Sequence, residues 1–271
     1  EVRLIPPAYV KPYVKRQKND AADAEAICEA VTRPNMRFVP IKTEEQQSVL
    51  VLHRARDLLM RQRTMILNAI RGHLAEFGII AAQGPRQVMG MIARLRDDGD
   101  ASLPEIARSA LLALGAHLEA LAGEIRALER QLMVWHRADP TSQRLETIPG
   151  VGLITATALA ASVSDPSVFK SGREFVAFLG LVPRQNSSGG KDRLGRISKM
   201  GDRYLRKLLV VGATSVIRRA GSNPTKTGAW VRSLMERKPA RVVTVAMANK
   251  TARIAWAVMT RGEAYRASPI A

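Results

Sequence analysis

The sequence has little cysteine, comparatively few acidic residues and no long apolar run. Its single cysteine, Cys28, excludes an internal disulfide framework and fits a reducing, cytoplasmic location. The longest strongly apolar runs, such as LLVVGA, are far too short to span a bilayer, and the start shows no signal-peptide pattern, so no membrane partner is expected. The four histidines are scattered without ligand partners at useful spacing, which gives no basis for a histidine metal site.

The shortage of acidic residues leaves a large positive charge. Only 24 Asp and Glu stand against 42 Lys and Arg in 271 residues, a formal net charge of +18. Such an excess suits a polyanionic partner, because each neutralised phosphate releases condensed counterions. Apolar residues make up 46% of the chain, which indicates a globular protein of one large or two modest domains. The composition therefore favours a folded protein that binds nucleic acid.

The first 140 residues read as a small α/β fragment followed by two long helices. Residues 1–43 predict a short strand (VRLI), a proline-punctuated loop, a helix over 19–31 and a second strand (RFVPI). A long helix is expected over 44–82 and another over 104–137, and the turn residues of 83–103 predict a connection between them.

The second long helix carries the most regular pattern in the sequence. Apolar residues alternate three and four apart without interruption, the spacing of a coiled-coil seam. The partner of this seam is either the 44–82 helix of the same chain or a second copy, and both arrangements can hold at once. The seam consists of Leu111, Leu114, Leu118, Leu121, Ile125, Leu128, Leu132 and Trp135.

From residue 141 onward the chain predicts a compact helical domain. It opens with IPGVGLITA, residues 148–156, which reads as two helices joined by a Pro-Gly-x-Gly turn. Gly150 and Gly152 permit a tight turn and close approach to a ligand, and the N–H groups that begin the second helix can bind a phosphate. The pattern resembles the helix-hairpin-helix motif, which grips a nucleic-acid backbone; a plain helix-turn-helix corner is the alternative.

The stretch RQNSSGGKDRLGRISKMGDRYLRK, residues 184–207, holds eight basic residues against two aspartates. We expect a loop whose glycines close around an anion, with Lys250 and Arg253 on the last helix as further exposed contacts. A hydroxyl of Ser187 or Ser188 among such cations could attack a phosphodiester, although from this stretch alone a role of the two serines in shaping a turn is favoured. The expected phosphate-binding side chains of the stretch are Lys191, Arg193, Arg196, Lys199, Arg203, Arg206 and Lys207, and its glycines are Gly189, Gly190, Gly195 and Gly201.

A pair of carboxylates lies near the start, in KNDAADA. Asp20 and Asp23 are three residues apart, so both project from one face of the predicted helix. Paired carboxylates can hold Mg²⁺ for phosphoryl transfer. By spacing alone, a solvated helix face explains the pair better.

The order of these features resembles the DEDD-type transposases of bacterial insertion sequences, the IS110 family, whose members include bridge-RNA-guided recombinases. KNDAADA, the helical hairpin, IPGVGLITA, the serine stretch and MANKTARIAWAV carry the resemblance. It implies a mainly α protein with the C-terminal part of a RuvC-like α/β domain (1–43), a coiled-coil helical region (44–140) and a C-terminal transposase domain (141–271). Asp20 and Asp23 fall at the last two acidic positions of a Mg²⁺ site. The family serine precedes a glycine, which selects Ser188, with Ser187 as the fallback.

The resemblance also implies a function. Element ends and target, both double-stranded DNA, would be cleaved and rejoined by transesterification, with a guide RNA as a candidate partner and a homo-oligomer formed through the coiled coil. The family's first Asp and its Glu would precede Glu1, so we expect an N-terminally truncated chain that is inactive alone in metal-dependent strand exchange. The alternatives are a RuvC-like metal-dependent nuclease with a structural serine and a non-catalytic nucleic-acid-binding protein.

Overall fold

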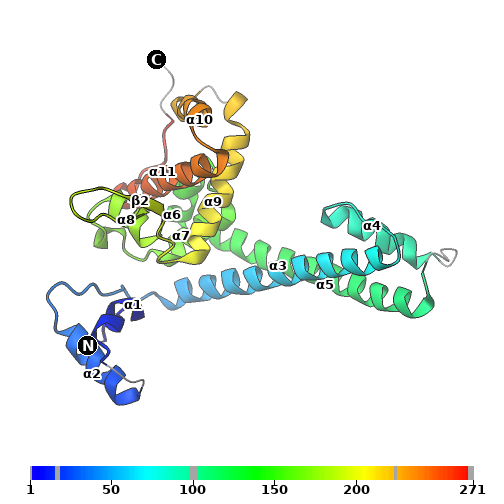
Figure 1. Cartoon of the computed structure of the whole chain (residues 1–271), viewed down its shortest axis with the longest axis horizontal. Helices are drawn as coiled ribbons and strands as arrows, with labels where there is room; N and C mark the ends of the chain where they lie inside the picture. The colour runs from blue at the N-terminus through cyan, green and yellow to red at the C-terminus, as the bar shows by residue number, and fades with distance from the viewer. Residues whose placement is uncertain (1, 16–18, 98–102, 223–224, 268–271) are drawn as a thin grey trace.

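The computed structural model describes residues 2–15, 19–97, 103–222 and 225–267. As predicted, the fold is mainly helical. It has three parts, which Figure 1 shows as a small N-terminal unit (2–43), a long helical arm (44–138) and a C-terminal body (139–267). The one sheet among the described residues is an antiparallel pair of short strands in the body. Over the same residues, no helix combines the length and the apolar character needed to cross a membrane.

The N-terminal unit differs from the predicted α/β fragment. Neither VRLI nor RFVPI forms a strand; they meet in a single antiparallel bridge, in which the Val39 N–H donates to the Leu4 carbonyl at 2.8 Å. Prolines explain this, because Pro6 and Pro40 have no N–H to extend a ladder in either direction. The helix predicted over 19–31 is present and is capped by the Asn19 side chain. The helices of the unit are α1 (Pro7–Val10), the 3-10 helix η1 (Lys11–Tyr13) and α2 (Asp20–Val31).

The arm is an antiparallel pair of helices, α3 (Glu44–Glu76) and α5 (Glu105–Ala138). Opposite ends meet, since the Trp135 indole N–H donates to Glu45 at 2.6 Å. Helix α3 begins with a capping box at Thr43 and stops at Glu76, six residues before the predicted end. Gly78 has φ of 76°, and the Ile79 N–H donates to the Leu74 carbonyl at 3.0 Å, which is the Schellman arrangement that closes a helix.

The predicted connection at 83–103 contains a helix, α4 (Pro85–Arg96). Pro85 occupies its first position, where the missing N–H costs nothing. Its buried Val88, Ile92 and Leu95 are spaced four and three apart and pack on α5. The contact is close: a Cβ added to Gly115 would lie 2.5 Å from the Ile92 Cγ2. The turn residues therefore mark the ends of this short helix rather than an irregular linker.

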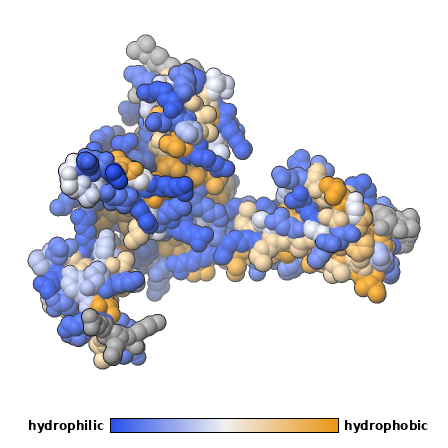
Figure 2. Space-filling view, viewed as in Figure 1, coloured by the Kyte–Doolittle hydropathy of each residue, from blue (hydrophilic) through white to orange (hydrophobic). Residues whose placement is uncertain are grey.

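The seam of α5 packs inside this chain. Leu118, Leu121 and Leu132 are buried, and α5 makes its main contact with α3. Of the two partners considered for the seam, the helix of the same chain is therefore the one found. These side chains are covered within the chain, whereas the seam residues Leu114, Leu128 and Trp135 are half-buried. Figure 2 shows apolar residues gathered along the arm, whereas the visible face of the body is mostly hydrophilic.

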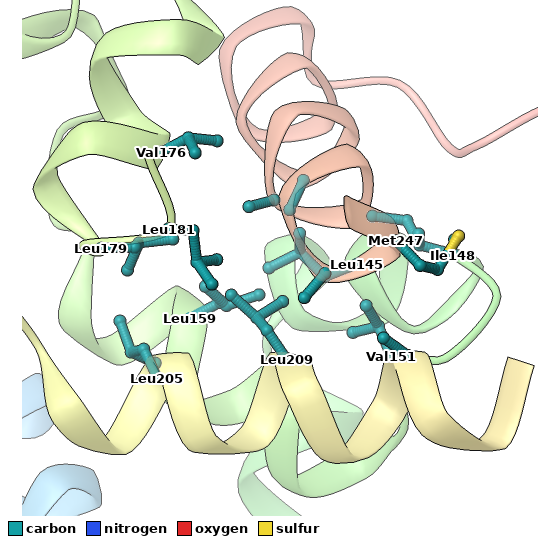
Figure 3. Close-up of a cluster of buried hydrophobic side chains, with 14 of the residues drawn as sticks. Leu145, Ile148, Val151, Leu159, Val176, Leu179, Leu181, Leu205, Leu209 and Met247 are labelled. Carbon is teal, nitrogen blue, oxygen red and sulfur yellow. The ribbon is translucent and has the colours of Figure 1, made fainter. Parts of the chain in front are cut away.

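The body packs its helices around one apolar core (Figure 3), in which side chains of the turn after α6 meet α7, α8, α9 and α11. Helix α9 turns Leu205 and Leu209 into this core, while Leu208 remains half-buried. Helix α11 buries Ala252 and Ala255 completely. The elements are α6 (Pro140–Glu146), α7 (Leu153–Ser162), η2 (Pro166–Val168), α8 (Gly172–Phe178), β1 (Pro183–Gln185), β2 (Leu194–Ile197), α9 (Arg203–Arg218), η3 (Ala220–Ser222), α10 (Lys226–Arg237) and α11 (Ala240–Arg261).

Candidate nucleic-acid interface

The stretch expected to be a loop is a β-hairpin, residues 183–197, which we call the serine hairpin. Strands β1 and β2 pair Pro183 with Ile197 and Gln185 with Leu194, with an irregularity in register between them. At the tip, the Lys191 N–H donates to the Ser188 carbonyl at 3.1 Å. Its central glycines have φ of 55° and 73°, as in a type I′ turn, which needs two residues of positive φ. The paired glycines therefore serve the turn and not an anion cradle.

The two serines have different surroundings. The Ser187 hydroxyl donates to Asp192 Oδ1 at 3.2 Å and accepts the Arg193 N–H at 3.1 Å, so it helps to shape the hairpin. The adjacent Ser188 is exposed at the tip, and within the described residues its hydroxyl has no hydrogen-bond partner. The surroundings of Ser187 fit a serine that shapes the turn. Ser188 instead has a hydroxyl that is open to a ligand.

The basic side chains of the serine hairpin are accessible and give the hairpin a positive charge. No ion pair neutralises them in the part of the chain that the structure describes. Guanidinium and ammonium groups without an ion-pair partner can present donors to phosphate oxygens. Arg184 differs from the others, because its guanidinium also donates to the Ser198 carbonyl at 3.3 and 3.4 Å. The exposed basic residues of the hairpin and of the turn that follows it are Arg184, Lys191, Arg193, Arg196, Lys199 and Arg203.

Below the hairpin, the backbone packs tightly on the start of α9. Gly201 has φ of 88°, and a Cβ there would lie 1.7 Å from the Phe178 carbonyl oxygen. The Arg206 guanidinium donates to the carbonyls of Leu179 at 2.9 Å and Met200 at 3.4 Å. The predicted phosphate contact of Arg206 therefore competes with two internal hydrogen bonds, and in this structure Arg206 supports the base of the hairpin.

The two glycines of the α6–α7 turn, both predicted to approach a ligand, have different surroundings. Gly150 has φ of 85° and touches α9 instead, since a Cβ on Gly212 would lie 1.9 Å from the Gly150 carbonyl oxygen. Gly152 is exposed, begins α7, and has open space where a Cβ would stand. The first N–H groups of α7 have no carbonyl of their own helix to bind. A ligand can therefore approach at Gly152, whereas Gly150 has a packing role.

A groove of about 590 Å³ runs past this turn, between α3 and α9. Lys207 lines it and is held by Asp57 of α3, with Nζ 2.6 Å from Oδ1. Arg56 lines it as well and is paired with Glu129. Ion pairs with Asp57 and Glu129 thus partly neutralise the positive charge of this groove, whereas no ion pair neutralises the described cations of the serine hairpin.

The two cations predicted on the last helix differ in exposure. Arg253 is exposed, as expected. Lys250 is half-buried, which corrects the prediction, and its Nζ lies 4.6 Å from the centre of the Trp230 ring, a cation–π contact. Burial, and then the neighbouring Arg253, hold the pKa of Lys250 below its ordinary value.

Asp20 and Asp23 lie on the exposed surface of the first turn of α2. Carboxylates at that place stabilise a helix through its dipole, which is a sufficient structural reason for both. Among the described residues, no group of three or more His, Cys, Asp or Glu side chains could hold a metal. The pair still fits Mg²⁺ in one respect, because that ion is commonly bound by one or two carboxylates with water and substrate phosphates completing its shell.

Sequence reasoning missed one polar cluster altogether. His53 contacts Tyr204 and Thr157, which are 151 and 104 residues away along the chain. Nothing in the local pattern around any of the three residues signals this meeting.

The structure thus shows an exposed serine near exposed cations on a strongly basic, mainly helical protein. Comparison with known proteins identifies the class as a transposase. Residues 142–228 match the "Transposase IS116/IS110/IS902 family", and residues 1–79 match the DEDD transposase family of IS110.

Three relatives are similar over almost the whole chain. A Pseudomonas aeruginosa protein named "Probable family 20 transposase" is 48% identical, over 98% of this chain and 79% of its own length. The transposase for insertion sequence element IS1328 of Yersinia enterocolitica is 44% identical, over 98% and 78%. The transposase for IS1111A of Coxiella burnetii is 42% identical, over 97% and 72%. The chain belongs to the IS110/IS116 family of insertion-sequence transposases, and is a DNA-binding enzyme of DNA transposition.

Proposed function

We propose that this transposase cleaves and rejoins DNA by transesterification, with Ser188 as the nucleophile. The observation that carries the proposal is the contrast between the two serines: Ser187 is engaged by Asp192 and Arg193, while Ser188 is exposed at a turn flanked by cations. In the reaction the Ser188 Oγ forms a bond to phosphorus and the bond from phosphorus to a deoxyribose oxygen breaks. The serine proton passes to solvent, and the departing oxygen takes a proton from solvent. Attack by another DNA end on the resulting phosphoserine diester reverses the step and rejoins the strand.

The cations of the serine hairpin have two tasks in this scheme. Arg193 and Arg196 donate to the non-bridging oxygens, where negative charge develops in the transition state. Lys191 and Lys199 add positive charge that draws the DNA backbone to the tip. These contacts hold a phosphodiester without reading its sequence.

The α6–α7 segment is proposed to act as a helix-hairpin-helix that holds the same DNA backbone. Gly152 leaves the first N–H groups of α7 accessible, and Lys207 lines the same groove. Arg253 is a further exposed cation, on α11. The arm is proposed to be a coiled coil, and the N-terminal unit to be part of a RuvC-like domain. A homo-oligomer is proposed as well; its contact would involve the half-buried seam residues of α5 or other surfaces, because α3 already packs on the fully buried ones.

Mg²⁺ is the metal we propose, and Asp20 and Asp23 would hold it. When bound, it would supply positive charge to offset the charge of a phosphodiester. A guide RNA that selects element ends and target is a further candidate partner. It would meet the same exposed cations, since RNA and DNA share the phosphate backbone.

The test compares Ser188→Ala with Ser187→Ala, each in a protein that also carries the family's first Asp and its Glu, in strand cleavage of double-stranded element-end DNA with Mg²⁺. Ser188→Ala should abolish cleavage while leaving DNA affinity unchanged. Ser187→Ala is the matched control and should retain cleavage, reduced by the loosened hairpin. Full cleavage by Ser188→Ala would instead favour a metal-dependent nuclease in which the serine is structural.

A further inference from the structure

Three polar side chains from three helices meet in the interior where the arm joins the body. His53 of α3 is 1% exposed and lies between Tyr204 of α9 and Thr157 of α7. Its Nδ1 is 3.0 Å from the Tyr204 hydroxyl, and its Nε2 is 3.0 Å from the Thr157 hydroxyl. Neither the DNA contacts nor the chemistry proposed above uses these residues.

The hydrogen bonds of this cluster run in one direction. The Thr157 hydroxyl donates to the Leu153 carbonyl at 2.8 Å, so it accepts from the Nε2–H of His53. The Nδ1 of His53 is then an acceptor, and the Tyr204 hydroxyl donates to it. Burial, and then the positive charge of Arg56, lower the pKa of His53 to about 4, while burial raises the pKa of Tyr204 to about 12. Both are neutral near pH 7, so every polar group has a complementary partner, and such a satisfied network fixes one arrangement of its helices.

Tyr204 lies in the first turn of α9, which is also attached to α3 at a second point. The Asp202 side chain accepts the Leu205 N–H at 2.8 Å and so caps the helix beside Tyr204. One turn further along both helices, Lys207 pairs with Asp57 at 2.6 Å. Two contacts spaced by one turn hold a helix end in rotation as well as in position.

The same turn of α9 supports the serine hairpin. Arg206 donates to the carbonyls of Leu179 and Met200, which flank the hairpin on its two sides along the chain. The Ser198 N–H donates to the Val182 carbonyl at 2.8 Å and closes the base. Packed contacts therefore connect α3, the first turn of α9 and the base of the hairpin without a gap.

We propose that His53 is a positioning residue, which through Tyr204 sets the first turn of α9 and thereby the serine hairpin relative to the long helix α3 of the arm. The arm and Ser188 are then mechanically coupled, and a change in how α3 is held changes the presentation of the serine. The consequence for strand cleavage rests on the proposed role of Ser188; the coupling itself does not.

The test is hydrogen exchange of backbone amides in the protein without DNA, comparing Tyr204→Phe with Thr157→Val. Each variant removes one hydroxyl from the same buried network, but only Tyr204→Phe releases α9. We expect the Ser198 and Lys199 amides at the base of the hairpin to exchange about tenfold faster in Tyr204→Phe and at the parent rate in Thr157→Val. Equal acceleration in both variants, or in neither, would overturn the proposal, because a general loss of stability does not discriminate between the two helices.

Asp57→Asn provides a second variant that does not disturb the interior, should Tyr204→Phe fail to fold. It removes the charge that holds Lys207, and we expect a smaller acceleration confined to the same two amides. Unchanged exchange there would count against the coupling. Cleavage is measured separately, in a protein that also carries the family's first Asp and its Glu: Tyr204→Phe should slow it about tenfold at unchanged DNA affinity. Faster exchange with unchanged cleavage would keep the coupling and reject its role in catalysis, whereas cleavage by Ser188→Ala would reject only the proposed nucleophile.

Discussion

The molecule contains two hairpins of opposite construction, the helical arm and the serine hairpin. The arm is held by apolar side chains, since its seam residues Leu118 and Leu132 are 3% and 0% exposed. The serine hairpin is held by backbone hydrogen bonds and positive-φ glycines, and residues 183–196 are all exposed. A backbone-held hairpin leaves most of its side chains free for a ligand, which suits the proposed phosphate-binding tip. The exceptions are Ser187, Asp192 and Arg184, whose side chains form hydrogen bonds within the hairpin and at its base. The helical arm is held by packing of its apolar side chains, and such packing suits a rigid support.

The largest effect should follow from breaking the arm. Replacing Leu118 and Leu121 with Glu places two charges in its apolar interior, and we expect a loss of more than about 4 kcal/mol of stability. Thermal unfolding followed by circular dichroism measures it. Ile106→Glu on the same helix is the control, because Ile106 is 85% exposed and its replacement should change stability by less than about 0.5 kcal/mol. Unaltered unfolding with a lower mass by light scattering would show that the seam joins two copies instead.

Breaking the base of the serine hairpin should cost less. Gly201→Ala adds a Cβ 1.7 Å from the Phe178 carbonyl oxygen at a φ of 88°, and we expect a loss of about 2–4 kcal/mol. Gly189→Ala at the tip has positive φ but no neighbour within 4 Å, so only backbone strain of about 1 kcal/mol remains. Urea unfolding compares the two variants. Equal losses would mean that the base is not packed as described.

The junction between the arm and the body should show a pH dependence set by His53. Its pKa falls from 6.5 in the unfolded chain to about 4 in the folded protein, so the unfolded state binds the proton more readily. Stability is therefore unaffected above pH 6.5 and decreases as the pH falls from 6.5 to 4, by about 3 kcal/mol at the low end. The difference in unfolding free energy between the parent and His53→Gln should narrow over this range. A constant difference would contradict the neutral, buried state of His53.

The smallest effect concerns the DNA contacts. Arg196→Ala removes an exposed, unpaired cation of the hairpin, and the slope of log affinity against log salt should become shallower by about 0.9. Arg206→Ala removes a guanidinium bound to two carbonyls, so it should lower stability and leave the slope nearly unchanged. Salt titrations of DNA binding separate the two variants. Similar slope changes in both would show that Arg206 also contacts phosphate.

The helical arm could be predicted from the sequence better than the serine hairpin could. The two arm helices were readable because their apolar period is long and local, although α4 was hidden by Gly84, Pro85 and Gly90, which resemble a linker. The serine hairpin was read as a loop because an exposed hairpin has no apolar alternation to reveal it. Its basic residues were correctly expected on the surface, except that Arg206 serves the fold. The His53 cluster could not be anticipated, because its partners meet only through the tertiary fold.

The most direct test of the central claim is peptide mapping of a covalent protein–DNA adduct, trapped during cleavage of element-end DNA by a protein that also carries the family's first Asp and its Glu. If Ser188 is the nucleophile, mass spectrometry finds the phosphodiester-linked nucleotide on Ser188 in the parent protein and in Ser187→Ala, and finds no adduct in Ser188→Ala. An adduct that maps to Ser187, or that persists in Ser188→Ala, would contradict the account.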